Sequence, residues 1–284
     1  MFSVLIPTYN YDITPLVMEI KNQCKTNKIE FEILAFDDGS NSSLNEVNTT
    51  INTLENCYFK VLPKNIGRSA IRNLLGKTAK YENLLFIDAG TTIENSEFIK
   101  NYMEHIDIDV LNGGMIAKKQ APKKPFKLRW LYTKNREHKA LCSSNFLIKK
   151  DIFFKFLFNE SVKKYGFEDV LFFDQLISNG IEVKVIQNPV LHNSDDDANT
   201  YLTKTKAGLE NLTNLIENGL LKPNSSKIYQ HYLKLEKYRL SKLTSKIHKW
   251  FIKIFLLNFN SSNPSLLLFD IYRLSYLCYI KTKD

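Results

Sequence analysis

The sequence is poor in the features that mark disulfide-rich, zinc-binding or membrane-spanning proteins. Its 284 residues include four cysteines and no CxxC pair: Cys24, Cys57, Cys142 and Cys278. Cysteines so far apart predict neither a disulfide framework nor a zinc site, and free thiols suit a reducing cytoplasm. No apolar run reaches the roughly 18 residues that a membrane-spanning helix needs.

Two further absences concern the N-terminal region. The first residues lack both a basic leader and a small-residue cleavage site, so we expect no signal peptide and a cytoplasmic protein. The segment Leu5–Asn10 contains no glycine. A nucleotidyltransferase on a related α/β fold would favour a glycine-rich phosphate loop early in the chain, so the sequence disfavours that class.

Positive charge is concentrated at one end of the chain. The formal net charge is +9, and from Lys206 onward 13 Lys and Arg face 5 Asp and Glu, which leaves the first 205 residues near neutral. We therefore predict a catalytic domain over residues 1–205 and a basic helical extension over residues 206–284. A basic extension can meet nucleic acid, anionic lipid or water. Because no nucleic-acid-binding motif is present, we expect no nucleic-acid partner.

Short apolar runs alternate with helical patterns over the first two hundred residues. This alternation predicts an α/β fold with a mostly parallel central sheet flanked by helices, which binds ligands at the carboxyl ends of its strands. The predicted strands are Phe2–Ile6, Phe31–Phe36, Tyr58–Leu62, Leu84–Ile87, Val110–Asn112, Asn145–Ile148 and Val183–Ile186. The predicted helices span residues 13–25, 42–54, 67–78, 95–105 and 169–178, and residues 118–139 are typical of a long, mobile loop.

Each of the first four predicted strands is followed by a polar turn. The turns are Pro7-Thr8-Tyr9-Asn10, Asp37-Asp38-Gly39-Ser40, Asn65-Ile66-Gly67-Arg68 and Asp88-Ala89-Gly90. Because the carboxyl ends of parallel strands meet at one edge of a sheet, these turns indicate a single crevice.

The order and spacing of these motifs resemble family 2 glycosyltransferases, which have the GT-A fold. The resemblance runs from Phe2 to about His192 and includes Gly166-Phe167-Glu168-Asp169. It implies an inverting enzyme that passes a sugar from a nucleoside-diphosphate sugar to a glycan or lipid-linked acceptor in bacterial surface polysaccharide synthesis. The alternative is a catalytically impaired relative that only binds sugar nucleotide or a partner protein, and Gly90 is the residue that supports it.

The resemblance places the nucleotide base and ribose beside Asp37 and Asp38, together with the turn of Pro7, Thr8, Tyr9 and Asn10. A carboxylate that accepts from a uracil imide N–H favours UDP as the carrier. The alternative for the two acids is an Asx turn or a helix N-cap. The remaining nucleotide-binding residues that the resemblance implies are Asn65, Gly67, Arg72 and Ala89, and Arg72 suits phosphate oxygens.

Asp88 stands where the family has its Asp-x-Asp metal motif. The resemblance implies that Asp88 holds Mn²⁺ or Mg²⁺ against the diphosphate, with His192 as a further ligand. The chain departs from the motif at Gly90, where the family has its second acid, and this departure leaves the metal affinity open. The alternative is that Asp88 forms a turn and that His192 is structural.

Glu168 and Asp169 open a predicted helix that ends at Gly180. The resemblance places the general base at the second acid, Asp169, where it would take the acceptor's proton during direct displacement at the anomeric carbon. The alternative is that both acids only stabilise the helix dipole. Ser144 and Asn145 open the strand that lines the donor sugar and the acceptor in the family.

The C-terminal region contains a basic amphipathic pattern. Apolar residues recur at helical spacing beside a row of lysines: Leu240, Leu243, Ile247, Trp250, Phe251 and Ile254, with Lys242, Lys246, Lys249 and Lys253. Such a helix can lie in a membrane interface, which predicts a peripheral contact with the inner face of the cytoplasmic membrane. The alternative is packing on the catalytic domain or on a second subunit of a homo-oligomer.

Overall fold

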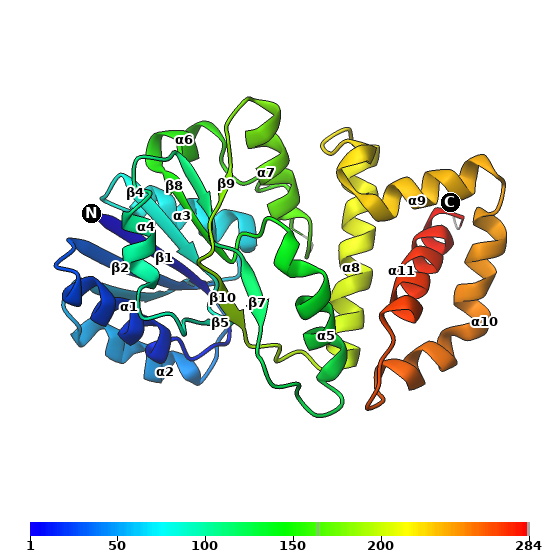
Figure 1. Ribbon diagram of the computed structural model, residues 1–284, viewed down its shortest axis with the longest axis horizontal. Coiled ribbons are helices and arrows are strands. Elements are labelled where there is room, and N and C mark those ends of the chain that lie inside the picture. Colours follow the sequence, from blue (N-terminus) through cyan, green and yellow to red (C-terminus); the bar gives the residue numbers. More distant parts are fainter. Residues whose placement is uncertain (164, 283–284) are drawn as a thin grey trace. The chain divides into compact units, whose positions relative to one another are not determined.

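A computed structural model describes residues 1–163 and 165–282, which form two compact units (Figure 1). Unit 1 comprises residues 1–117, 137–163 and 168–193. Unit 2 comprises residues 118–136, 165–167 and 194–282. The boundary that we predict after residue 205 lies within helix α8, Ala198–Glu217.

Unit 1 is built on a seven-stranded sheet with the order β3-β2-β1-β4-β8-β6-β9. The strands are β1 Phe2–Thr8, β2 Phe31–Asp37, β3 Cys57–Val61, β4 Asn83–Ile87, β6 Val110–Asn112, β8 Asn145–Lys149 and β9 Lys184–Val185. Strands β1 to β4 are parallel to one another, and β8 runs antiparallel to both β4 and β6. This mixed, mostly parallel sheet confirms the predicted α/β class.

Successive strand residues point to opposite sides of the sheet. Both sides are apolar here, so helices cover both faces. Val4 and Ile6 belong to the core beneath α1 and α4, whereas Leu5 belongs to the core beneath α3, α6 and α7. The helices of unit 1 are α1 Thr14–Thr26, α2 Leu44–Thr49, α3 Arg68–Thr78, α4 Phe98–Met103, α6 Lys150–Lys155 and α7 Glu168–Ser178, with 3₁₀ turns η1 Thr50–Thr53 and η2 Glu137–Lys139.

A second, three-stranded sheet with the order β5-β10-β7 also belongs to unit 1. Its strands are β5 Thr91–Thr92, β10 Val190–His192 and β7 Met115–Ala117. His192 pairs with Thr91, which follows the turn after β4. The small sheet therefore brings the end of the family-like region to the polar turn that begins at Asp88.

Unit 2 is helical, and an aromatic core that includes Tyr201, Phe259 and Tyr272 joins α5, α8, α10 and α11. Its helices are α5 Lys127–Asn135, α8, α9 Lys227–Lys237, α10 Ser241–Phe259 and α11 Leu266–Lys281, with the 3₁₀ turn η3 Pro223–Ser225. Helix α5 lies in the segment that we predict as a mobile loop. That prediction is wrong for α5, because Leu128 and Trp130 are buried and give the helix an apolar face. Among the described residues, no helix is long and apolar enough to cross a bilayer.

Candidate active site

The turn after β2 is held by its own two carboxylates. Buried Asp37 accepts hydrogen bonds from the backbone N–H and the hydroxyl of Ser40, at 2.8 and 2.7 Å. Asp38 accepts from the backbone N–H groups of Ile66 and Gly67, at 2.7 and 3.0 Å. Burial raises the pKa of Asp38, although these two N–H groups oppose the shift. Asp37 thus stabilises its own turn, and Asp38 ties this turn to the start of α3.

Gly39 allows the two turns to approach each other closely. Its φ is +65°, and a side chain at this position would overlap the backbone of Lys64. Both the left-handed backbone and the absence of a Cβ are therefore required here. Asn65 follows at this contact and is exposed.

The turn after β1 contacts the turn after β2. The backbone N–H of Asp38 donates to the carbonyl of Thr8 at 2.9 Å, and the Ser42 hydroxyl donates to the Asn10 side chain at 2.7 Å. Tyr9 stands between them with 56% of its surface exposed. The residues predicted for the nucleotide base are therefore brought together, and Tyr9 offers an open aromatic ring.

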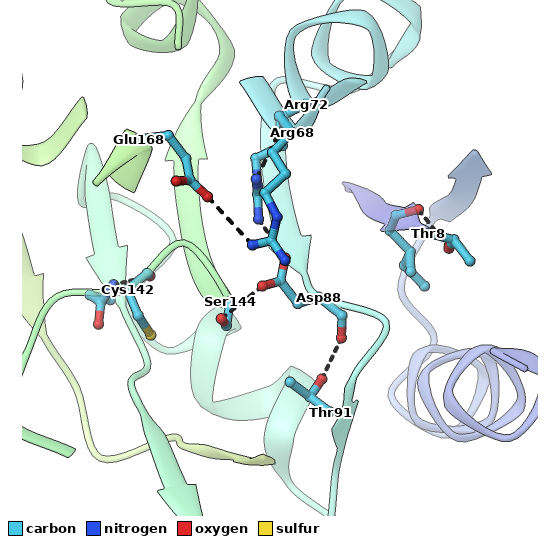
Figure 2. Close-up of polar contacts among 10 residues, drawn as sticks. Thr8, Arg68, Arg72, Asp88, Thr91, Cys142, Ser144 and Glu168 are labelled. Atoms are coloured by element: carbon cyan, nitrogen blue, oxygen red, sulfur yellow. Dashed lines mark hydrogen bonds and ion pairs between the residues drawn. The ribbon is translucent and has the colours of Figure 1, made fainter. Parts of the chain in front are cut away.

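Asp88 lies between Arg72 and Ser144 at the end of β4 (Figure 2). Its Oδ1 is 2.6 Å from Nη2 of Arg72, and its Oδ2 accepts from the Ser144 hydroxyl at 2.8 Å. The Arg72 side chain is 2% exposed and packs over the ring of Phe158. A buried guanidinium thus holds the Asp88 carboxylate, and the turn just before β8 supplies the hydroxyl.

Glu168 and Asp169 at the start of α7 lie beside this cluster. The buried Glu168 carboxylate is 3.4 Å from Nη1 of Arg68 through Oε1, while its Oε2 has no hydrogen-bond partner in the described part of the chain (Figure 2). Burial raises the pKa of Asp169 to about 7, and the charge of Glu168 adds to the shift. Arg72 lowers that pKa and Asp88 raises it, but burial is the largest cause of the shift.

Aromatic packing fixes the start of α7. Phe172 stacks on Phe158 with ring centroids 4.1 Å apart, and Phe173 and Leu176 are buried in the same core. The Arg72 guanidinium lies over the same Phe158 ring. The start of α7, with its two acids, and the Arg72 side chain of α3 therefore pack against one aromatic residue.

The segment that resembles the family's Asp-x-Asp motif contains one acid, Asp88. Position 90 is glycine, and the Tyr11 hydroxyl lies 3.6 Å from the point that a Cβ of Gly90 would occupy. His192 is positioned next to Thr91 by strand pairing, as described above. No group of three or more His, Cys, Asp and Glu side chains that could hold a metal ion occurs among the described residues. The sequence prediction did not include Tyr11, although it directly follows the first polar turn.

Asn145 is placed beneath the site rather than in it. Its side chain is fully buried, accepts from the Tyr102 hydroxyl at 2.6 Å and donates to the carbonyls of Gly114 and Asn188 at 3.0 and 2.8 Å. Both amide hydrogens are therefore used inside the fold. Of the two residues predicted for the donor and acceptor, only Ser144 has a side chain in contact with the charged cluster.

Comparisons with known proteins agree with this arrangement. The family model described as "Glycosyl transferase family 2" matches residues 3–165. No curated protein sequence matches significantly. Among solved structures, TarS 1-349 from S. aureus in complex with UDP is 22% identical with a TM-score of 0.51, over 98% of this chain and 88% of that chain.

A second solved structure is the mannosyltransferase PcManGT from Pyrobaculum calidifontis, in complex with GDP-Man and Mn²⁺. It is 12% identical with a TM-score of 0.60, over 99% of this chain and 86% of that chain. At such identities the likeness shows the fold, which is the predicted GT-A fold. Since the family model spans more than half of the sequence, the chain belongs to glycosyl transferase family 2 and is a glycosyltransferase.

Proposed function

We propose that the protein transfers a sugar from a UDP-sugar to a hydroxyl group of a glycan or a lipid-linked saccharide, with inversion at the anomeric carbon. One observation carries the proposal: two arginines one helical turn apart on α3 contact Asp88 at the end of β4 and Glu168, the neighbour of Asp169, at the start of α7. The pair suits a diphosphate, and a carboxylate with a raised pKa suits proton removal from an acceptor hydroxyl. All four cysteines are free, which is in keeping with a reaction in the cytoplasm.

We assign the nucleotide to the crevice between the turns after β1 and β2 and the turn before α3. The exposed ring of Tyr9 can stack on the base. Carboxylate oxygens of Asp37 and Asp38 have further lone pairs that can accept from a uracil imide N–H. We assign the diphosphate to the N-terminal end of α3, where Asn65, Gly67 and Arg72 are placed, and to the turn of Asp88 and Ala89. These assignments favour a pyrimidine nucleotide.

We infer that the enzyme binds a divalent metal together with its donor at the end of β4. Mg²⁺ commonly binds through one or two carboxylates, with substrate phosphates and waters as the other ligands. Asp88 would be the main protein ligand for Mg²⁺ or Mn²⁺, and His192 on the adjoining β10 would be the second. Such a cation offsets negative charge on the departing nucleotide.

Restoring an acid at position 90 tests this assignment. Gly90 does not have a positive φ, and a Cβ there would make an ordinary contact with Tyr11, so Gly90→Asp is expected to fold normally. We expect it to bind Mn²⁺ about 10-fold more tightly in the presence of UDP, measured by electron paramagnetic resonance of free Mn²⁺. Gly90→Asn is the matched control without the charge. Equal Mn²⁺ affinity in the two variants would place the metal elsewhere.

In the proposed step the acceptor oxygen attacks the anomeric carbon while its proton passes to Asp169. The bond between the anomeric carbon and the diphosphate oxygen breaks, and the electron pair leaves with the nucleotide. Arg72 stabilises the negative charge of the leaving diphosphate. Glu168 is a positioning residue, because its negative charge raises the pKa of Asp169. A single displacement of this kind inverts the anomeric configuration.

Donor binding and donor turnover test the function separately. UDP, GDP and dTDP are titrated calorimetrically, and nucleotide release is followed from the corresponding sugars with Mn²⁺, Mg²⁺ or a chelator. We expect UDP to bind most tightly and one UDP-sugar to be hydrolysed slowly in a metal-dependent reaction. Binding without release, even with mixed cell-envelope acceptors, would favour the catalytically impaired relative that Gly90 suggests. No binding of any nucleotide would refute the proposed function.

A further inference from the structure

Helix α10 in unit 2 has two apolar sides. One side is packed inside the unit through buried residues that include His248, Phe255 and Phe259. The other side is exposed and carries Leu243, Trp250, Ile254 and Leu257, whose surfaces are 55%, 67%, 54% and 75% accessible. At 100° per residue these four side chains fall on one line, opposite the buried side. We call them the α10 stripe.

A row of lysines borders the α10 stripe. Lys242, Lys246, Lys249 and Lys253 follow one another at helical spacing along one flank, and all four are exposed. Lys249 also lies over the ring of Tyr279. The 19 residues of α10 contain no Asp or Glu. The exposed part of the helix is therefore an apolar stripe with purely positive charge along its edge.

The neighbouring helices leave this side of α10 open. Helix α11 packs between α8 and α10, so α10 meets the rest of its unit through α11 and α9 (Figure 1). The packed side of α10 already supplies its share of the unit 2 core. Four large exposed side chains in a line are thus not needed for folding, and an exposed apolar patch of this kind marks an interaction site.

We propose that the α10 stripe docks unit 2 on the surface of an anionic lipid bilayer. An interfacial helix has an apolar face with Trp, Phe and Leu, and Lys on its polar side, which is the pattern seen here. Trp250 enters the boundary between headgroups and acyl chains, and the lysines meet anionic headgroups. A second copy of the chain is a poorer occupant, because a two-fold interface would bring two lysine rows together without an acid on either helix.

The charge requirement is tested by sedimentation of the full chain with vesicles. Wild type is expected to bind mixed phosphatidylcholine–phosphatidylglycerol vesicles, and to bind pure phosphatidylcholine vesicles much more weakly. Changing Lys242, Lys246 and Lys253 to Gln should weaken binding to the mixed vesicles about 100-fold at low salt. The matched control changes Lys227, Lys234 and Lys237 of α9 to Gln, which removes the same charge from another exposed helix. Equal losses in both variants would contradict docking through α10.

The apolar requirement is tested with Trp250→Ser combined with Leu257→Ser. Both side chains are mostly exposed, so the unit should fold unchanged while vesicle binding falls at least about 30-fold. Leu220→Ser combined with Leu233→Ser is the control away from the stripe. The chain has two tryptophans, and Trp130 is buried, so the blue shift of fluorescence on vesicle binding should vanish in Trp250→Phe. The proposal is overturned if the wild type does not bind anionic vesicles. It is also overturned if light scattering shows that the wild type is a dimer and that the α10 stripe variants, but not the control variants, are monomers.

Discussion

We expect an Asp169→Asn protein to bind its nucleotide sugar but to transfer the sugar about 10³-fold more slowly than the wild type. The amide keeps the shape of the carboxylate but cannot take the acceptor's proton. Asp169 is partly buried at the start of α7, and its first turn is fixed by the aromatic core below, so the substitution should leave the crevice intact. The measurement is single-turnover transfer at saturating donor, with binding of the same donor determined by calorimetry.

The pH dependence of transfer identifies the group that acts as base. The pKa of Asp169 is raised to about 7 by burial and by Glu168, so the wild-type rate should rise with pH up to about 7 and then level off. Glu168→Gln removes the neighbouring charge and should lower that pKa, which moves the rising limb to lower pH without abolishing turnover. If Asp169→Asn keeps the wild-type rate together with its rising limb, Asp169 is not the base.

The same shift has a consequence for stability that separates inactivity from unfolding. An acid whose pKa is higher in the folded than in the unfolded protein binds its proton more tightly when folded. Its contribution therefore favours folding at low pH and is lost as pH rises from about 4 to about 7. Asp169→Asn, which stays neutral, should melt at a higher temperature than wild type at about pH 8 and should lose this advantage at about pH 4.

An Arg72→Met protein loses both stability and nucleotide affinity. The guanidinium is 2% exposed and lies 2.6 Å from Asp88, whose side chain is 25% exposed. Removing one partner of such a pair leaves a poorly solvated charge, which should cost about 2 kcal/mol of unfolding free energy. Loss of a guanidinium at the diphosphate should weaken UDP binding about 100-fold. Urea unfolding and calorimetric titration with UDP measure the two effects.

Arg68→Met is the matched control for Arg72→Met. Arg68 stands one helical turn earlier on α3, its side chain is half-exposed, and its ion pair with Glu168 is longer, at 3.4 Å. Because this contact is longer and half-exposed on the arginine side, its loss should cost less unfolding free energy than Arg72→Met. In an Asp88→Asn background, Arg72→Met should cost clearly less than in wild type, because the unpaired charge is gone. Equal costs in both backgrounds would show that the pair is not what stabilises this region.

The sequence predicted the regular elements that have a strong pattern. Strands β1, β2 and β4 are mostly apolar and are followed by polar turns, and their observed ends lie within two residues of the predicted ones. Helices α1, α3 and α7 also agree, because apolar residues recur at helical spacing in each. The sequence did not predict strands β5, β7 and β10, because a segment of two or three residues is too short to show an alternation of apolar and polar residues.

The sequence could not show which polar residues of the crevice are free to meet a ligand. Asp37, Asp38 and Asp88 all stand at the ends of apolar strands, so the sequence does not distinguish an acid that binds a ligand from one that stabilises a turn. Their hydrogen-bond donors come from elsewhere in the chain: the start of α3 for Asp38, and the start of β8 for Asp88. Asn145 was assigned to the substrate from the resemblance, and the hydrogen-bond partners of its side chain come from other parts of the chain. Such partners are fixed by the pairing of strands, which a single sequence does not display.

Strand β8 pairs with β4 but is synthesised much later, so the strands of the central sheet cannot all associate at the same time during synthesis. Strands β1 to β4 are complete at Ile87, whereas β8 begins only at Asn145. We expect the first four strands to associate while the rest of the chain is still being made, since N-terminal segments fold first. Until β8 arrives, β4 presents an unpaired edge that can recruit a wrong partner. A nucleotide bound to the early turns would stabilise this half by mass action. The part of the enzyme that recognises the nucleotide would then exist before the part that carries out the transfer.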